Sequence, residues 1–241
     1  MIDCRSAKSL LAVVGTVAVL GGCGFESAAT GETHNETLSF DLDDSKTVRV
    51  GMRMGGGELR VKSGTPKLME GKFTYHVPNW KPVVDYKAGS GELTLSQPGY
   101  SSSFGNTVNN WDVTLNGDVP LEITANLGAG EANLELGKMN LSRVELNIGA
   151  GKMSVDLRGE PKRDYTVQIS GGVGETVVHL PKDAGISATA TKGIGDISTD
   201  GLENRNGVWV NPDRIGAPVS SSRREGRRRA DPVDTLIAER A

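Results

Sequence analysis

Aromatic residues are scarce in this 241-residue chain, at 5% of the sequence, although hydrophobic residues reach 37%. A core must therefore be built from Val, Leu, Ile and Ala rather than from aromatic rings. Cysteine is scarcer still, because Cys4 and Cys23 are the only two. If Cys4 is removed with an N-terminal leader, a single cysteine remains and an internal disulfide is excluded.

The sequence also lacks the residue patterns that are typical of catalytic and metal sites. Its three histidines, His34, His76 and His179, are far apart and do not have the spacing of metal ligands. It contains no Ser-His-Asp set, no paired-carboxylate motif and no Cys-His cluster. We interpret the short acidic run at 41–44 as a solvated turn, with weak cation binding as the alternative. We therefore expect a non-enzymatic protein with no catalytic residue, no metal site and no cofactor.

An excess of positive charge is missing from the body of the chain. The formal net charge is −3, and many of the basic residues lie in the leader or beyond residue 219, so the part between them is acidic. Nucleic-acid binding requires a basic surface that displaces counterions from phosphates. We expect no nucleic-acid partner.

The N-terminus has the pattern of an export signal. Arg5 and Lys8 precede an apolar run from Leu10 to Leu20. This run is too short to cross ~30 Å of hydrocarbon as a stable helix. The following Leu20-Gly21-Gly22-Cys23 resembles a bacterial lipobox, in which Cys23 would be lipidated and become the mature N-terminus.

This resemblance implies that residues 1–22 are a lipoprotein signal peptide and that Cys23 anchors the chain to a membrane. Residues 23–36 are small and polar without periodicity, as expected of a tether. The expected location is the bacterial cell envelope, facing the periplasm or the cell exterior. The alternative is an ordinary signal peptide that leaves Cys23 as a free thiol.

The strongest internal pattern is a repeat of Gly-x-Gly between alternating apolar strands. The second glycine of each motif recurs at a nearly constant interval, and an interval of this length is typical of a solenoid whose coils bury one face against the next. Glycine there would allow positive φ angles and close stacking of successive corners. The four glycine pairs are Gly128 and Gly130, Gly149 and Gly151, Gly172 and Gly174, and Gly193 and Gly195.

Two ligand-binding motifs contain similar glycines. The dinucleotide fingerprint needs a helix after its glycines, whereas a strand follows each pair in this chain. Calcium-binding nonapeptides recur with a much shorter period than the one found here. We therefore interpret the glycine pairs as structural corners.

Before the regular repeat, residues 37–110 have a looser pattern. We expect irregular N-terminal coils there, with two irregular glycine corners at Gly55–Gly57 and Gly89–Gly91, and a surface loop at 96–110. Residues 111–218 would form the regular coils. The tryptophans Trp80, Trp111 and Trp209 lie in or beside expected loops, where they would cap the stack or, alternatively, form a binding surface.

The stretch from Trp111 to Leu136, and above all Leu127-Gly128-Ala129-Gly130-Glu131, resembles the toast-rack families of bacterial envelope proteins. The similarity covers Thr37 to Pro218. It implies an all-β fold, a single right-handed roll of stacked β-coils, and it supplies no catalytic residues. In LiaF-like members the domain takes part in sensing envelope stress through protein partners, but those members have membrane helices that this chain lacks.

These observations favour a membrane-tethered interaction or structural module of the envelope with an unidentified envelope protein partner, and with stress sensing as one role. The alternative is an enzyme or small-ligand binder whose site is built from the loops at 76–86, 96–110 and 202–218.

The coil pattern stops before the C-terminus. Residues 219–241 are polar and basic, and we expect a disordered tail. A sharper interpretation is a frameshifted last coil, because codons for Arg223–Asp234 can be chosen so that the next frame spells Val-Val-Lys-Gly-Gly-Val-Gly-Gln-Ile-Gln-Leu. In that case the last complete coil would have an uncapped edge that favours self-association.

Overall fold

The computed structural model describes residues 32–99, 107–181, 187–191, 203–206, 208–210 and 234–239. Regular structure in these ranges is β-strand, apart from the 3-10 helix η1 (Pro78–Trp80), and none of their helices could cross a membrane. The strands are β1 (His34–Phe40), β2 (Val48–Ser63), β3 (Met69–Tyr75), β4 (Val83–Lys87), β5 (Glu92–Ser96), β6 (Asn109–Leu115), β7 (Leu121–Glu135), β8 (Leu141–Asp156), β9 (Thr166–His179), β10 (Ser187–Thr191), β11 (Glu203–Arg205), β12 (Val208–Val210) and β13 (Asp234–Glu239).

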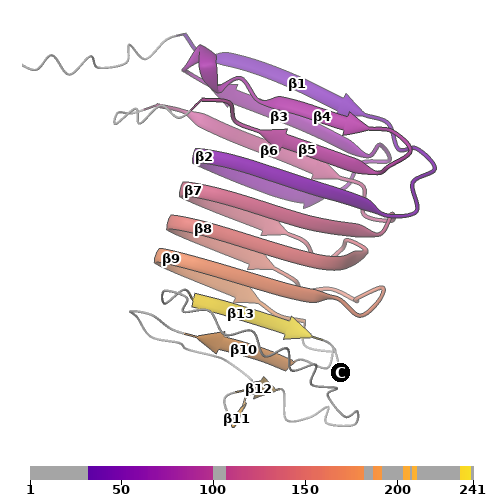
Figure 1. Ribbon diagram of the computed structural model, residues 1–241, viewed down its shortest axis with the longest axis vertical. Coiled ribbons are helices and arrows are strands. Elements are labelled where there is room, and N and C mark those ends of the chain that lie inside the picture. Colours follow the sequence, from indigo (N-terminus) through magenta and orange to yellow (C-terminus); the bar gives the residue numbers. More distant parts are fainter. Residues whose placement is uncertain are drawn as a thin grey trace, which may run out of the picture.

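Four long strands, β2, β7, β8 and β9, form the centre of the fold (Figure 1). Each bends at a glycine-rich corner, which divides it into a first arm before the corner and a second arm after it. Neighbouring long strands run parallel and remain paired through both arms. The result is the predicted all-β stack of coils, a β-solenoid.

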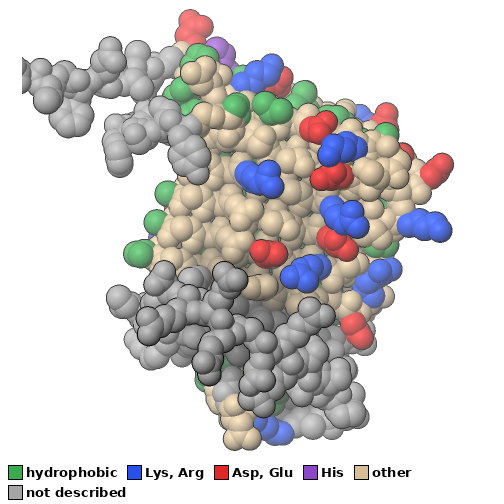
Figure 2. Space-filling model, viewed as in Figure 1, with side chains coloured by type: hydrophobic (Ala, Val, Ile, Leu, Met, Phe, Trp, Pro, Cys, Tyr) green, Lys and Arg blue, Asp and Glu red, His purple; other side chains and the backbone are tan. Residues whose placement is uncertain are grey.

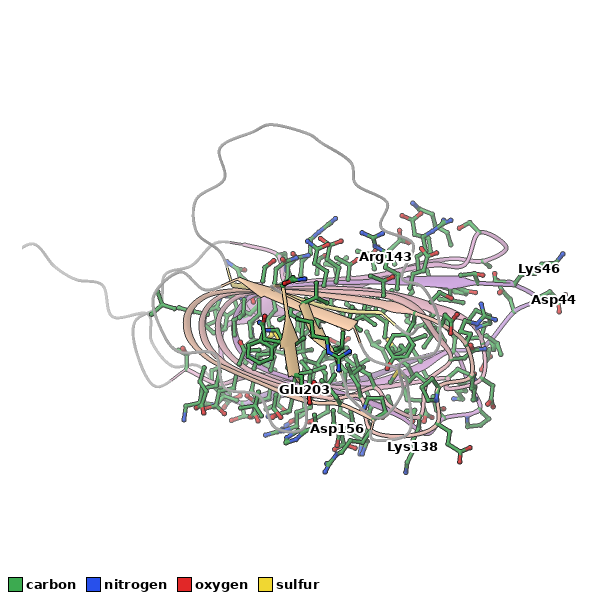
Figure 3. The ribbon with its side chains drawn as sticks, turned by 90° about the horizontal axis from the view of Figure 1, so that it is seen from below. Asp44, Lys46, Lys138, Arg143, Asp156 and Glu203 are labelled. Carbon is green, nitrogen blue, oxygen red and sulfur yellow. The ribbon has the colours of Figure 1, made fainter. Side chains whose placement is uncertain are left out.

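The two sets of arms form two broad sheets with the core between them. The front sheet contains β4, β5 and the first arms, and the back sheet contains β1, β3, β6 and the second arms. Viewed along the stack, the coils overlay as a flattened oval, with Arg143 pointing out of one broad face and Asp156 out of the other (Figure 3).

Period-two alternation decides which side chains enter the core. In β7, Leu121, Ile123, Ala125 and Leu127 of the first arm and Ala132 and Leu134 of the second arm are buried, and the residues that alternate with them within each arm are more exposed. A fully buried aliphatic side chain of this size contributes about 1.5–3 kcal/mol. Because each arm has a buried row of side chains on one side only, that row is covered by the opposite arm and by the neighbouring coils. A single coil therefore cannot form a core without its neighbours.

The corners stack directly on one another. Gly57, Gly130, Gly151 and Gly174 pair successively along the stack and have φ angles of 132°, 133°, 129° and 141°. Residues that have a Cβ atom rarely adopt this backbone conformation. Gly193 and Gly195 lie outside the described residues.

The structure corrects the expected N-terminal organisation. Gly55–Gly57, predicted to be an irregular corner, belongs to the same column as the regular corners, so β2 is the first coil of the stack. Gly89 and Gly91, also predicted to form a corner, instead lie in the tight turn of the β4–β5 hairpin. The first strand, β1, begins at His34, within the expected tether.

The prediction that the whole tail is disordered is wrong for residues Asp234–Glu239. Asp234–Glu239 form β13, which pairs antiparallel with the first arm of β9 because that arm offers a free edge on the side away from β8. The rest of the tail lies outside the described residues, as do the leader and Cys23.

Candidate functional site

The outer surface of the front sheet, which we call the front face, carries charges of alternating sign. Paired positions on five neighbouring strands follow one another across the sheet, and their side chains are Lys87, Glu92, Arg49, Glu122 and Arg143. Two contacts in this row are ion pairs, at 2.8 Å between Lys87 Nζ and Glu92 Oε2 and 3.2 Å between Arg49 Nε and Glu122 Oε2. Figure 2 shows the blue and red side chains gathered along one side of this face.

The front face is hollowed where β2 has no side chain. Gly51 lies between Thr94 of β5 and Thr124 of β7, and this gap lies within a shallow depression of about 320 Å³. Its rim is polar and charged, with residues Arg49, Arg53, Glu92, Thr94, Glu122, Thr124, Asn126 and Arg143. The depression is open to solvent, so it suits contact with a surface better than enclosure of a small molecule.

The charges on this rim do not fully balance. Arg49 pairs with Glu122, whereas Arg53 and Arg143 form no ion pair with any residue that the structure describes. Two arginines near a polar hollow can bind carboxylates through bidentate hydrogen bonds. The front face is therefore suited to a partner with acidic groups.

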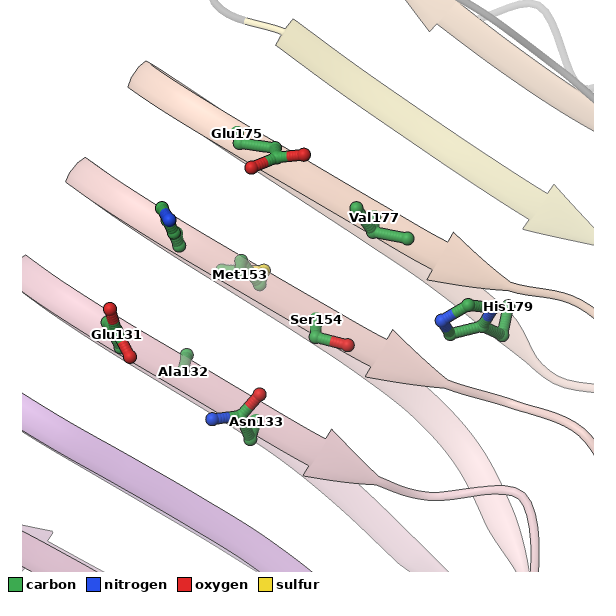
Figure 4. Close-up of a pocket in the computed structure, with 9 residues that line it drawn as sticks. Glu131, Ala132, Asn133, Met153, Ser154, Glu175, Val177 and His179 are labelled. Atoms are coloured by element: carbon green, nitrogen blue, oxygen red, sulfur yellow. The ribbon is translucent and has the colours of Figure 1, made fainter.

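A second depression, also of about 320 Å³, lies on the outer surface of the back sheet near its β9 end (Figure 4). Glu131, Lys152 and Glu175 form one paired row across it. Val177, 40% exposed, and His179 lie on β9. This depression also lacks walls that would exclude water.

The acidic run at 41–44 stabilises loops. Asp43 accepts hydrogen bonds from the backbone amides of Ser45, at 2.9 Å, and Gly89, at 2.6 Å. The Ser45 side chain, the Gly89 amide and Tyr86 lower the pKa of the Asp43 carboxyl below its ordinary value. Asp43 thus holds the β4–β5 turn against the loop before β2.

The three histidines, which the sequence predicts to be far from one another, have different neighbours in the structure. His34 stacks on Tyr75 with ring centroids 5.3 Å apart, His76 contacts Thr33 through Nε2 at 3.1 Å, and His179 is on the back face. Across the described ranges, no three His, Cys, Asp or Glu side chains are grouped closely enough to hold a metal ion.

Two of the tryptophans expected beside loops are buried. Trp111 lies in β6 with no exposed surface, packs edge-to-face on Phe73 at 5.6 Å between centroids, and donates its indole hydrogen to Asn109 Oδ1. Trp80, on η1, is 6% exposed. Neither supplies a binding surface, and Trp209 lies in β12 at a half-buried position.

Sequence reasoning did not identify the front-face row. Its members come from strands far apart in the chain, and Arg49 meets Glu122 only because β2 and β7 pair. The available signal was the alternation itself, which places Arg49, Gly51 and Arg53 on one side of their strand.

The comparisons with known proteins agree with this architecture. The family profile described as the N-terminal domain of toast_rack, DUF2154, matches residues 29–179. The crystal structure of a candidate cell adhesion protein from Clostridium sporogenes is similar, with a TM-score of 0.74 and 32% sequence identity over 77% of this chain and 91% of that one. A candidate adhesin from Bacteroides fragilis has 10% identity over 62% of this chain and 96% of that one, and its TM-score of 0.24 is too low to support an argument. No curated protein sequence matches the chain significantly.

Proposed function

Because this chain belongs to the toast-rack family, we propose that it is a non-enzymatic interaction module of the cell envelope, tethered to a membrane through Cys23. The observation that carries this proposal is the front face, a continuous outward surface with paired charges and a shallow polar hollow around Gly51. Rigid, flat, regularly patterned surfaces of stacked repeats are suited to binding other macromolecules. The similar Clostridium sporogenes protein, described as a candidate for cell adhesion, supports the same class of function.

The proposed partner is an envelope protein with an acidic surface, since Arg53 and Arg143 lie beside the hollow and form no ion pair with another described residue. A role in envelope stress sensing would use the same contact, with the partner being the sensor. An enzyme or small-ligand binder built from the loops at 76–86, 96–110 and 202–218 has no comparable support among the described residues, because the residues that line the two depressions come from other segments.

Site-specific photo-crosslinking in cells tests the surface. A benzoyl-phenylalanine at Thr124, on the front face, should capture one discrete partner. The same residue at Thr114, which occupies a half-exposed outward position on the back sheet, is the matched control and should capture much less. Arg53→Glu with Arg143→Glu should reduce capture from Thr124 at least fivefold. Equal capture from both faces, or capture that the double variant does not change, would contradict the proposal.

The tether is tested separately. Cys23→Ser should abolish incorporation of radiolabelled lipid and move the protein from the membrane fraction to the soluble fraction. Incorporation that survives the substitution would show that Cys23 is not the anchor.

A further inference from the structure

The C-terminal strand β13 lies between two strands that the repeat would place side by side. It pairs antiparallel with β9 on one side and with β10 on the other. Ile237, for example, is paired with Gln168 of β9 and with Thr189 of β10. Figure 1 shows β13, in yellow, between β9 and β10.

The register of β10 is that of a further coil. Gln168 and Thr189 face each other across β13. Their separation along the sequence equals that of Glu122 and Arg143, which pair directly between β7 and β8. Each residue of β10 is therefore aligned with the residue of β9 that it would contact if the period simply continued.

The sequence after β10 also continues the repeat. Gly193 and Gly195 follow Gly172 and Gly174 at the same interval that separates Gly130 from Gly151, so the next Gly-x-Gly motif in the sequence has the spacing from β10 that a further coil would need. β13, in contrast, runs antiparallel to strands that are otherwise parallel in this part of the stack.

β13 completes only one of the two sheets. Its pairing with β9 runs from Thr166 to Gly171 and stops before the corner. Among the described residues, no strand pairs with the second arm of β9 on the side away from β8, and there Thr176 is exposed although its paired residue Met153 is buried. A bent coil in this place would cover both arms and the corner.

We propose that β10 is the first arm of a fifth coil whose docking site on β9 is occupied by β13, and that β13 is displaceable. When β13 leaves, β10 pairs directly and parallel with the first arm of β9, with Thr189 opposite Gln168. The tail strand thus acts as a built-in block to extension of the stack by one coil.

Disulfide trapping distinguishes the two arrangements, because it depends on the separation of the strands. Adjacent strands are about 4.8 Å apart, so strands separated by a third are about 9.6 Å apart. A disulfide needs Cα atoms within about 7 Å. In the full chain with Cys4 and Cys23 replaced by Ser, Gln168→Cys should therefore cross-link with Ile237→Cys and hardly at all with Thr189→Cys.

Releasing β13 should reverse this preference. The double variant Leu236→Pro with Ile237→Pro removes two adjacent backbone N–H groups of β13, one directed toward β9 and the other toward β10. It should raise the yield of the Gln168→Cys/Thr189→Cys cross-link at least tenfold. Leu236→Val with Ile237→Val keeps strand propensity and is the matched control, which should not raise it. A chain that ends at Pro218 provides a second route to the released state.

Two results would overturn the proposal. One is a Gln168→Cys/Thr189→Cys cross-link of equal yield in the valine and proline variants. The other is the absence of this cross-link in both released variants while β7 and β8 remain protected from hydrogen exchange, which would show a folded stack without a docked β10.

Discussion

At the scale of single residues, the two glycines of the β8 corner meet different requirements. Gly151 has a φ of 129°, a conformation that residues with a Cβ rarely adopt. Gly149 has no such angle, but a Cβ there would press on the carbonyl oxygen of Gly128 in the preceding coil. The second glycine therefore permits both the bend and close stacking, whereas the first permits close stacking alone.

The charges at the end of the second arm of β8 form a compact ion pair. Arg158 Nη2 donates to Asp156 Oδ2 at 2.6 Å, and Arg158 Nε donates to Asp156 Oδ1 at 2.9 Å. This bidentate contact is the main reason that the pKa of Asp156 falls from an ordinary 3.8 to about 2. Because the pKa is lower in the folded state, the pair stabilises the fold above pH 3.8, and that contribution is lost as the pH falls from about 4 to about 2.

Arg158→Gln should raise the pKa of Asp156 toward 3.8, because the guanidinium no longer stabilises the carboxylate. An NMR titration of the Asp156 carboxyl carbon measures this directly. Arg163→Gln is the control, since the Arg163 guanidinium contacts Ser142 Oγ instead, and it should leave the titration unchanged. A pKa near 2 that persists in Arg158→Gln would assign the shift to another cause.

At the scale of elements, the first corner of the stack is capped by side chains instead of by another corner. Asn109 Nδ2 donates to Gly56 O at 2.7 Å and to Gln97 Oε1 at 3.0 Å, and Gln97 Oε1 also accepts from Gly55 N. Polar backbone atoms that would face a preceding coil are thereby satisfied. These contacts cap the stacked corners at the β2 end.

Asn109→Ala should destabilise the protein by about 2–3 kcal/mol, because it leaves Gly56 O and the buried Trp111 indole without their Asn109 partners. Chemical unfolding followed by tryptophan fluorescence measures the loss. Asn110→Ala, at the next, half-exposed position, should change stability by no more than about 0.5 kcal/mol. If the two substitutions lowered the free energy of unfolding equally, Asn109 would not be a cap of the first corner.

The strands and three of the corners were predictable because their signals are local. Alternation across Leu121–Leu127 fixes which side is buried, and the spacing from Gly130 to Gly151 fixes the coil length. The membership of Gly57 in the column was not predictable, because β3 to β6 separate it from Gly130 and hide the period. A Gly-x-Gly such as Gly89–Gly91 serves equally well in a hairpin turn.

The candidate surface could not be predicted for a related reason. The hollow at Gly51 exists because Thr94 and Thr124 lie on either side of it, and this depends on pairing between segments that are distant in the sequence. Local sequence determines that Gly51 faces outward. Only the tertiary pairing determines what surrounds it.

At the scale of the whole molecule, the described strands cover the two ends of the stack to different extents. The β2 end is covered by β1, β3, β4, β5 and β6, whereas at the other end β13 covers only the first arm of β9. Terminal repeats of a solenoid normally carry a complete cap. The interpretation of residues 219–241 as a frameshifted last coil stays a prediction.

The nucleotide sequence of the gene tests that interpretation. We expect the codons for Arg223–Asp234, read one base later, to spell a strand, a Gly-x-Gly corner and a second strand. A shifted frame without a corner would identify the basic tail as native.

The central claim is that stacked glycine corners hold the coils in one cooperative fold, and global unfolding by denaturant of two Gly→Ala variants tests it most directly. Gly151→Ala should lose at least about 3 kcal/mol, because its Cβ would meet Gly130 O and its φ would be strained. Gly51→Ala should be neutral or slightly stabilising, since its Cβ would lie 3.8 Å from Thr94 Oγ1, an ordinary contact. Both replace a strand glycine, so effects on the unfolded chain cancel. Free energies of unfolding for the two variants that agree within about 1 kcal/mol would contradict the account.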